Sequence, residues 1–587
     1  METLKITDMK KWMALCVLAM GPLVLAQGFL HTDGQRILDG GGNNVLLRGL
    51  GLGGWMVQEG YMLQTSAFSG PQHKIKEKIE QLIGTENTEA FYAAYLANGV
   101  TKRDIDSLKA WGFNSVRLPM HYNLYTPPLE AERPGQIKWL DQGFEMTDKL
   151  LAWCAANEMY LILDLHAAPG GQGHDANISD YDPTKPSLWE SAANRKKMIA
   201  LWGKIAERYK DSPWIGGYDI INEPNWNFEG GNANGCDERD NGPLRKLMVD
   251  ITQVIRAVDP NHIIFIAGNC WGNNYNGIFP LWDDNTVISF HKYWNHNTQE
   301  SIQQFLDYRE THNAPIWLGE SGENSNVWFR ESLRLMERNN IGWAYWPMKK
   351  VENTAGVTSV TKNPEYGTLL QYWEHGGERP DVEFARSALM QLAENYNMAN
   401  VTVMPDVIDA MFRQVHSEGT RPYTRLVVPG MIPATHYDMG TQDEAYKDAD
   451  FINLRVSTGE RTPWNTGRKM RNDGVDIQLS SDNRGNGYEV FDIQDSEWLL
   501  FTVEVGESGT YDLGIRYSGG ENGSAVHLEA QGKTLGGTLS LAPTGSASRY
   551  ATATLSGVAL KAGRQQVKLV FDRGGFNLNY LDFTKTE

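Results

Sequence analysis

The chain has 587 residues, of which 41% are apolar and 21% are charged, so it is too long for one hydrophobic core and we expect two or more domains. A formal net charge of −18 excludes a polyanionic nucleic-acid partner and suits a neutral one. The 19 Trp and 24 Tyr are many, and their rings suit sugar stacking as well as core packing.

The first element in chain order is an uncharged run over residues 12–26, preceded by Lys10 and Lys11 and ended by a small residue. It is shorter than the ~20 residues that a membrane span needs, so residues 1–26 are predicted to be a secretory signal peptide. A lipoprotein anchor at Cys16 is the alternative, but the usual small residue does not precede that cysteine. No later stretch of the sequence is long and apolar enough to span a bilayer. We therefore expect a secreted protein, extracellular or periplasmic.

From about residue 40 to about 350, short apolar strands alternate with amphipathic stretches such as residues 148–159 and 244–259. Repeated eight times, this alternation predicts a (β/α)8 TIM barrel of the α/β class, which we assign to residues 27–400. A doubly wound open sheet is the alternative, but no Gly-x-Gly-x-x-Gly turn follows the first strand. The predicted strands are 45–50, 115–118, 160–165, 218–221, 263–266, 287–290, 316–318 and 343–346.

Beyond residue 425 the pattern changes to short strands with Gly and Ser turns. In residues 497–505, for example, the alternate residues Leu499, Phe501, Val503 and Val505 are apolar and share one face of the predicted strand. Period-two alternation over many short runs predicts an all-β jelly-roll sandwich, assigned to residues 428–587. Residues 401–427, with a helical segment at 406–417, are interpreted as a linker that packs on the barrel.

Two predicted strands of the barrel end in a carboxylate. Glu223 stands in "DIINEPNW" (219–226), and Glu320 stands in "APIWLGESG" (314–322). Strand ends of one barrel meet at its mouth, and retaining glycoside hydrolysis needs a general acid and a nucleophile about 5–5.5 Å apart. The pair therefore predicts a double-displacement glycosidase, which needs two carboxylates and water and no cofactor.

Other strand ends offer supporting groups. Arg117 can hold a nucleophilic carboxylate ionised, Asn222 can donate to a sugar 2-hydroxyl, and Trp346 can form an apolar floor under a pyranose ring. Further polar groups that can fix the carboxylates are His166, His291 and Tyr293.

The sequence predicts no metal site. Cys154, Cys236 and Cys270 would remain after removal of a leader, so one disulfide at most can form, its pairing is open, and the spacing fits no zinc pattern. His291 and His296 are five residues apart, which suits no usual ligand pair.

In their order along the chain, these motifs resemble glycoside hydrolase family 5 over roughly residues 40 to 350. The resemblance implies that Glu223 is the acid/base and Glu320 the nucleophile, in agreement with the interpretation from the residues themselves. The motifs that carry it are Arg117, His166, Asn222-Glu223-Pro224, His291-x-Tyr293, Gly319-Glu320-Ser321 and Trp346.

Residues 47–62 ("LRGLGLGGWMVQEGYM") and 164–175 ("DLHAAPGGQGHD") resemble the exo-β-1,3-glucanases of that family. The resemblance implies that Glu59 contacts a terminal glucose, with Trp55 beside it. The sequence departs from that pattern after Gln172 and in residues 291–297, and these positions determine which glycosidic linkage the family members cleave. We therefore expect a β-glucan polysaccharide or oligosaccharide as the substrate, most simply a β-1,3-glucan cut from its end. The open alternatives are a β-1,6- or β-1,4-glucanase, a transglycosylating glucan remodeller and a non-catalytic polysaccharide-binding protein.

Residues 429–587 resemble carbohydrate-binding module family 6. Asn577 matches a sugar-contacting Asn of that family, and Phe491 lies near the position of one stacking aromatic. The second aromatic is missing, with Ala547 near its place, and Pro433-Ala434-Thr435 replaces the acidic motif that would hold calcium. Without two aromatic walls the usual sandwiching of a sugar ring is lost, so the sandwich is expected either to bind sugar in another way or to serve as a structural partner of the barrel that binds none.

Overall fold

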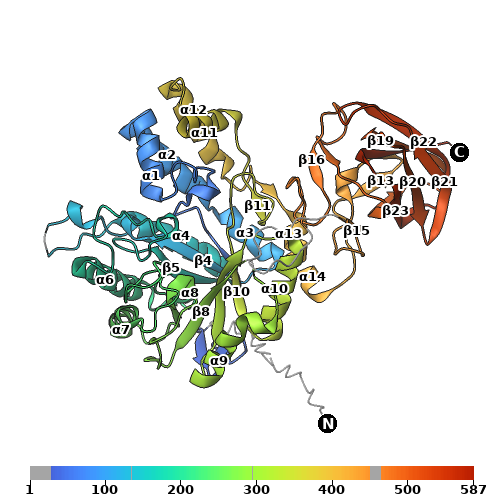
Figure 1. Ribbon diagram of the computed structural model, residues 1–587. Coiled ribbons are helices and arrows are strands. Elements are labelled where there is room, and N and C mark those ends of the chain that lie inside the picture. The colour runs from blue at the N-terminus through green and yellow to red at the C-terminus, as the bar shows by residue number, and fades with distance from the viewer. Residues whose placement is uncertain (1–27, 134, 294, 450–463, 587) are drawn as a thin grey trace, which may run out of the picture.

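The computed structural model describes residues 28–133, 135–293, 295–449 and 464–586 (Figure 1). The predicted signal peptide lies outside these residues. Among the residues described, no helix has both the length and the apolar character that crossing a membrane requires. Figure 1 shows an α/β body and, beside it, a β-rich body in orange and red.

Eight parallel strands close into a barrel in the order β10-β3-β4-β5-β6-β7-β8-β9. The closed sheet confirms the predicted TIM barrel and excludes the open sheet. The first strand begins at Arg48 rather than at Val45, because the Val45 N–H donates to Ile37 O (2.8 Å), outside the barrel. The barrel strands are β3 (Arg48–Gly51), β4 (Ser115–His121), β5 (Tyr160–Ala167), β6 (Ile215–Asp219), β7 (Ile264–Ala267), β8 (Thr286–Lys292), β9 (Ile316–Gly322) and β10 (Gly342–Trp346).

Amphipathic helices cover the outside of the barrel. In α7 every third or fourth residue from Leu244 to Ile255 is apolar and buried, so one stripe of the helix faces the strands. The helix predicted at 148–159 ends at Ala156, because Glu158 adopts left-handed backbone with φ 50°. The covering helices are α3 (Lys102–Trp111), α4 (Asp141–Ala156), α6 (Ala192–Tyr209), α7 (Gly242–Arg256), α9 (Gln303–His312) and α10 (Asn326–Arg338), and the short helices α5 (Ala176–Ser179) and α8 (Asn269–Gly272) lie in loops.

A hairpin of β1 (His31–Asp33) and β2 (Arg36–Leu38) precedes the barrel. Leu30 and Ile37 of this segment pack with Tyr160 and other residues near the strand starts, and so cover that end of the barrel. The opposite end, where the strands finish, stays available for a site. Four further helices share a separate apolar cluster: α1 (Gln72–Ile83), α2 (Thr85–Gly99), α11 (Pro364–His375) and α12 (Val382–Asn395).

In the residues that the structure describes, the C-terminal part is a sandwich of two six-stranded sheets, which confirms the predicted β-sandwich. In β18 the alternating residues Leu499, Phe501, Val503 and Val505 are all buried in its core. One sheet contains β13 (Leu426–Val428), β15 (Tyr446–Lys447), β18 (Glu497–Val505), β20 (Ser524–Ala530), β21 (Lys533–Leu541) and β23 (Gly563–Arg573). The other contains β14 (Gly430–Pro433), β16 (Ile477–Leu479), β17 (Tyr488–Val490), β19 (Gly509–Gly519), β22 (Tyr550–Leu560) and β24 (Phe576–Lys585).

The segment between the two bodies is folded. It forms α13 (Pro405–Met411) and α14 (Arg413–His416), and before them β12 (Thr402–Val403) pairs with β11 (Thr358–Ser359). Met404, Val407 and Met411 join the apolar cluster of the barrel. The segment is therefore a packing element that fixes the start of the sandwich beside the barrel.

Candidate active site

A cavity of about 720 Å³ opens among the residues that end the barrel strands. Cavities of about 300–1,000 Å³ are typical of ligand sites. The structure brings together around it the predicted residues Glu59, His166, Glu223, His291, Tyr293, Glu320 and Trp346.

The backbone of the Asn222-Glu223-Pro224 turn explains how Glu223 reaches the cavity. Glu223 has φ 39°, a left-handed conformation that costs a non-glycine residue about 1–3 kcal/mol. Side-chain amides hold the turn: Gln172 donates to Asn222 O (2.9 Å), and Asn225 donates to Glu223 O (3.0 Å). The strained turn aims the carboxylate inward from the end of β6.

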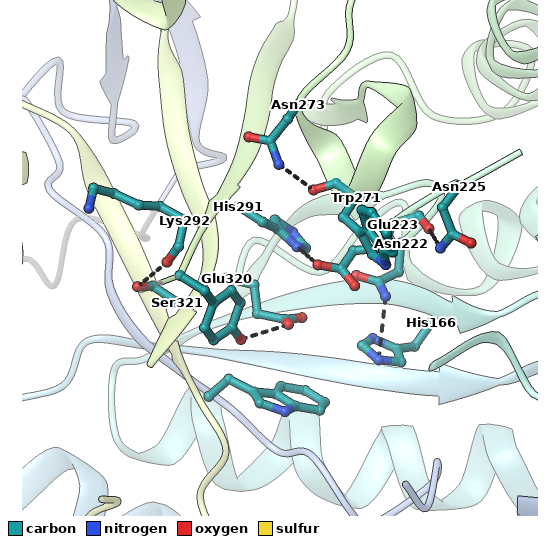
Figure 2. A network of polar contacts seen from close by, with 12 residues as sticks. His166, Asn222, Glu223, Asn225, Trp271, Asn273, His291, Lys292, Glu320 and Ser321 are labelled. Carbon is teal, nitrogen blue, oxygen red and sulfur yellow. Dashed lines mark hydrogen bonds and ion pairs between the residues drawn. The ribbon is translucent and has the colours of Figure 1, made fainter. Parts of the chain in front are cut away.

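Glu223 and Glu320 face each other across the cavity floor (Figure 2). One carboxylate oxygen of each and one ring nitrogen of His291 lie within 4.8 Å of one another. His291 Nδ1 is 2.6 Å from Glu223 Oε1, and the Tyr293 hydroxyl donates to Glu320 Oε1 at 2.8 Å. Both carboxylates are about 95% buried, so little water screens their interaction.

The environment pushes the pKa values of the two carboxyl groups apart. Burial and the charge of Glu320 raise the pKa of Glu223 above its ordinary value. Burial alone would raise the pKa of Glu320, but interactions with His291 and Arg117 bring it below the ordinary value. The arrangement thus favours a protonated Glu223 beside an ionised Glu320, the pairing that an acid and a nucleophile require.

Arg117 lies beneath the cavity rather than on its surface. Its guanidinium donates to Glu320 Oε2 (2.8 Å), to Asp219 Oδ2 (2.9 Å) and to Asn222 Oδ1 (2.8 Å), and it is 1% exposed. A buried cation shared in this way favours the ionised form of Glu320 and restricts its orientation. Sequence reasoning missed Asp219 and Asp164, which pair with Arg117, although Asp164 shares a strand face with His166.

A second carboxylate group lies around His166. His166 Nδ1 is 2.8 Å from Asp164 Oδ2, and its Nε2 is 3.8 Å from Glu59 Oε1. Burial lowers the pKa of His166, but Asp164 and Glu59 more than offset it and raise the value to about 10. Burial raises the pKa of Glu59 to about 7. His166 and Glu59 thus bring hydrogen-bond donors and acceptors to the cavity wall.

Trp346 forms the apolar part of this floor. Its ring stacks on His166 at 5.0 Å and 8°, and its N–H donates to the Tyr61 hydroxyl at 2.7 Å. A Cβ at Gly51 or Gly53 would lie within 2.6 Å of the indole, so only glycine fits there. The Gly-x-Gly pattern of residues 51–53 is therefore a requirement for the position of Trp346.

The structure corrects the prediction for Trp55. Its indole is 5% exposed, donates to Leu96 O at 2.8 Å and packs against Gly99, whose Cβ would lie 2.6 Å from the ring. Among the described residues, those that line the cavity do not include Trp55. A tryptophan beside Glu59 in sequence thus turns into the core, because helix α2 offers it a closely fitting groove.

Several residues of the cavity wall were not predicted. Trp271 lies next to a disulfide between Cys236 and Cys270, which ties the loop after β6 to the loop after β7, while Cys154 is free and buried. Trp271 N–H also donates to Pro224 O at 3.1 Å. The other unpredicted wall residues include Tyr61, Asn273, Glu323, Lys350, Trp464 and Arg468.

The two predicted sugar contacts of the sandwich lie apart from this cavity. Asn577 donates to Glu489 Oε1 at 2.9 Å, and Phe491 lies against Gly467. Both side chains are half-buried. Their role in sugar binding stays a prediction.

Known proteins resemble both parts of the chain. Residues 73–351 match Cellulase (glycosyl hydrolase family 5), and residues 468–585 match Carbohydrate binding module (family 6). A beta-xylosidase of Phanerodontia chrysosporium is 26% identical over 380 residues, which are 58% of this chain and 75% of that protein. Endoglucanase C of Acetivibrio thermocellus is 23% identical over 331 residues, covering 45% and 88%. A probable glucan 1,3-beta-glucosidase A of Aspergillus clavatus is 24% identical over 255 residues, covering 42% and 55%.

Proposed function

Since residues 73–351 form a glycosyl hydrolase family 5 domain and residues 468–585 a family 6 carbohydrate binding module, we propose that this glycosidase is a secreted, retaining β-glucan hydrolase. Its proposed substrate is a β-1,3-glucan cut from the chain end. The observation that carries the proposal is the pair of buried carboxylates, Glu223 and Glu320. One carboxylate oxygen of Glu223 and one of Glu320 lie within 4.8 Å of each other. Retaining enzymes place the two groups about 5–5.5 Å apart, and inverting enzymes about 6.5–9.5 Å.

The proposed reaction is a double displacement. Glu320 attacks the anomeric carbon while Glu223 gives its proton to the leaving oxygen, so the glycosidic bond breaks as the glycosyl ester forms. Glu223 then takes a proton from water, whose oxygen attacks the anomeric carbon and releases Glu320. Arg117 and Tyr293 donate to Glu320 and so stabilise its charge when it is the attacking and again when it is the leaving group.

The preference for β-1,3-glucan is supported by Glu59, which lines the cavity within reach of His166, and by the resemblance of residues 47–62 to exo-β-1,3-glucanases. One similar relative is a probable glucan 1,3-beta-glucosidase, and its name agrees with a preference for the β-1,3 linkage. A second candidate is a β-xylosidase, because the relative of that name is similar over 58% of the chain.

A product profile over time tests the linkage and the mode of attack. Linear β-1,3-glucan, β-1,6-glucan, cellulose, mannan and xylo-oligosaccharides would be digested side by side. We expect glucose alone from the β-1,3-glucan from the first time point, with inversion or retention read from the anomer by NMR. Xylose as the fastest product would favour the second candidate, and early oligosaccharides would contradict attack at the chain end.

The rate should depend on pH with two limbs. Activity needs ionised Glu320 and protonated Glu223, so it should fall at low pH as Glu320 gains a proton and at high pH as Glu223 loses one. Because the pKa of Glu320 is lowered and that of Glu223 raised, the active range lies between them. Initial rates across pH, compared with those of Glu59→Gln, check the assignment, since burial raises the pKa of Glu59 to about 7 and its titration must be separated from that of Glu223. A flat profile would contradict it.

A further inference from the structure

The outer wall of the cavity includes two residues of the C-terminal part of the chain. Trp464 and Arg468 line the same cavity as Glu223 and Glu320, although more than a hundred residues separate them from the last barrel strand. Next to them in the wall stand Lys350 and the residues up to Ala355, which follow β10. The cavity is thus built by both bodies of the molecule.

A buried polar network fixes this wall against the barrel. Asn472, which is fully buried, donates from its side chain to Asn324 O (2.9 Å) and from its backbone to Asp406 Oδ2 (2.8 Å). Asn326 N–H donates in return to Asn472 O at 2.9 Å. Directional bonds between buried groups specify one arrangement, because any other would leave them unpaired.

The same network holds Trp464 in place. Its indole N–H donates to Asn472 Oδ1 at 2.9 Å, and the ring, 6% exposed, packs with the apolar cluster of the barrel. The guanidinium of Arg468 lies 4.4 Å from the centre of that ring, and its backbone N–H donates to the buried Asn465 at 2.8 Å. The Arg468 side chain is exposed and lines the cavity. The Trp464 ring is therefore ordered before any ligand arrives, which lowers the entropy cost of binding.

We propose that Trp464 and Arg468 form a subsite for a further sugar unit of an oligosaccharide, so that the C-terminal part of the chain completes the active site of the barrel. A cavity of about 720 Å³ is of the size that takes drug-sized ligands, which are larger than one pyranose. The edge of Trp464 offers apolar surface to sugar C–H groups, and Arg468 offers several N–H donors to hydroxyls. This subsite rests on the proposed hydrolase function.

The test compares substrates of increasing length. Trp464→Ala and Arg468→Ala would be assayed on β-glucosyl fluoride and on β-1,3-gluco-oligosaccharides from the disaccharide to the hexasaccharide. We expect kcat/KM on the hexasaccharide to fall about tenfold for Trp464→Ala and somewhat less for Arg468→Ala, with the smallest loss on glucosyl fluoride. Trp464→Phe should keep most of the increase in kcat/KM that the unmodified protein shows from the disaccharide to the hexasaccharide. Equal losses on all substrates, or none, would overturn the subsite.

A matched control is Trp498→Ala in the same sandwich. Trp498 also has a cation over its ring, Lys568 Nζ at 4.4 Å, but it lies on β18 away from the cavity wall. Its kcat/KM values should equal those of the unmodified protein at every length. If Trp464→Ala lowers the thermal unfolding temperature, the kinetics of Arg468→Ala become the test of the subsite. The Arg468 side chain is exposed, so its removal should leave the stability of the protein unchanged.

Calorimetric titration separates this inference from the proposed function. In the Glu320→Gln background, the hexasaccharide should bind more tightly when Trp464 is present than when it is Ala. Failure of the unmodified protein to cleave any substrate, with this difference still seen, would refute the hydrolase function and support the subsite. Equal binding with and without Trp464, or no binding at all, would refute the subsite.

Discussion

Replacing Glu320 with Gln is expected to lower kcat on the best glucan by about 10⁴-fold or more, because an amide cannot form the glycosyl ester. The side chain keeps its size, and the amide oxygen can still accept from Arg117, while the amide NH2 takes the place of the oxygen that accepts from Tyr293 and can donate to that hydroxyl. The fold should therefore stay intact. Initial rates and thermal unfolding of the variant check both statements.

Two further measurements make the assignment of Glu320 specific. Azide fits the space that a truncated side chain leaves, so Glu320→Ala with a β-glycosyl fluoride should yield the α-glycosyl azide. Glu337→Gln is the matched control, since this carboxylate pairs with Arg48 outside the cavity and should keep the normal rate. If Glu320→Gln retained a tenth of the normal rate, another residue would have to be the nucleophile.

Replacing Glu223 with Gln should lower kcat on glucan by about 10²–10⁴-fold, the usual worth of a general acid and base. The loss should depend on the leaving group. A dinitrophenyl glycoside needs no protonation, so its glycosyl ester should form at nearly the normal rate and then accumulate, because no base activates water. A rapid burst of dinitrophenol followed by a slow steady state is the expected trace.

Azide tests the second half of this role. It needs no general base, so it should speed the steady state of Glu223→Gln and yield the β-glycosyl azide, the anomer opposite to that from Glu320→Ala. Removal of the partner ring in His291→Ala should move the alkaline limb of the pH profile to higher pH, since His291 contacts Glu223 at 2.6 Å and lowers the pKa of that carboxyl. Equal losses on glucan and on the dinitrophenyl glycoside would contradict the acid role.

Much of the barrel could be predicted from local sequence. A closed parallel sheet buries each strand on both faces, so its strands are continuous apolar runs in the sequence. Runs such as 160–165 and 316–318 recur between amphipathic stretches and can therefore be recognised as strands. Strand-end motifs follow from the same rule. Because Glu223 and Glu320 stand where their strands end, the topology of a barrel brings them to one mouth.

The sequence by itself thus determined the two domain types and the two carboxylates that face each other. Tertiary structure alone decided that Trp55 turns into the core, that Asp164 and Asp219 share Arg117, and that Cys236 pairs with Cys270. It also decided that Trp464, from the second domain, closes the cavity of the first. These outcomes depend on how side chains far apart in the sequence pack together and on which buried polar groups form hydrogen bonds. The spacing of neighbouring residues determines neither.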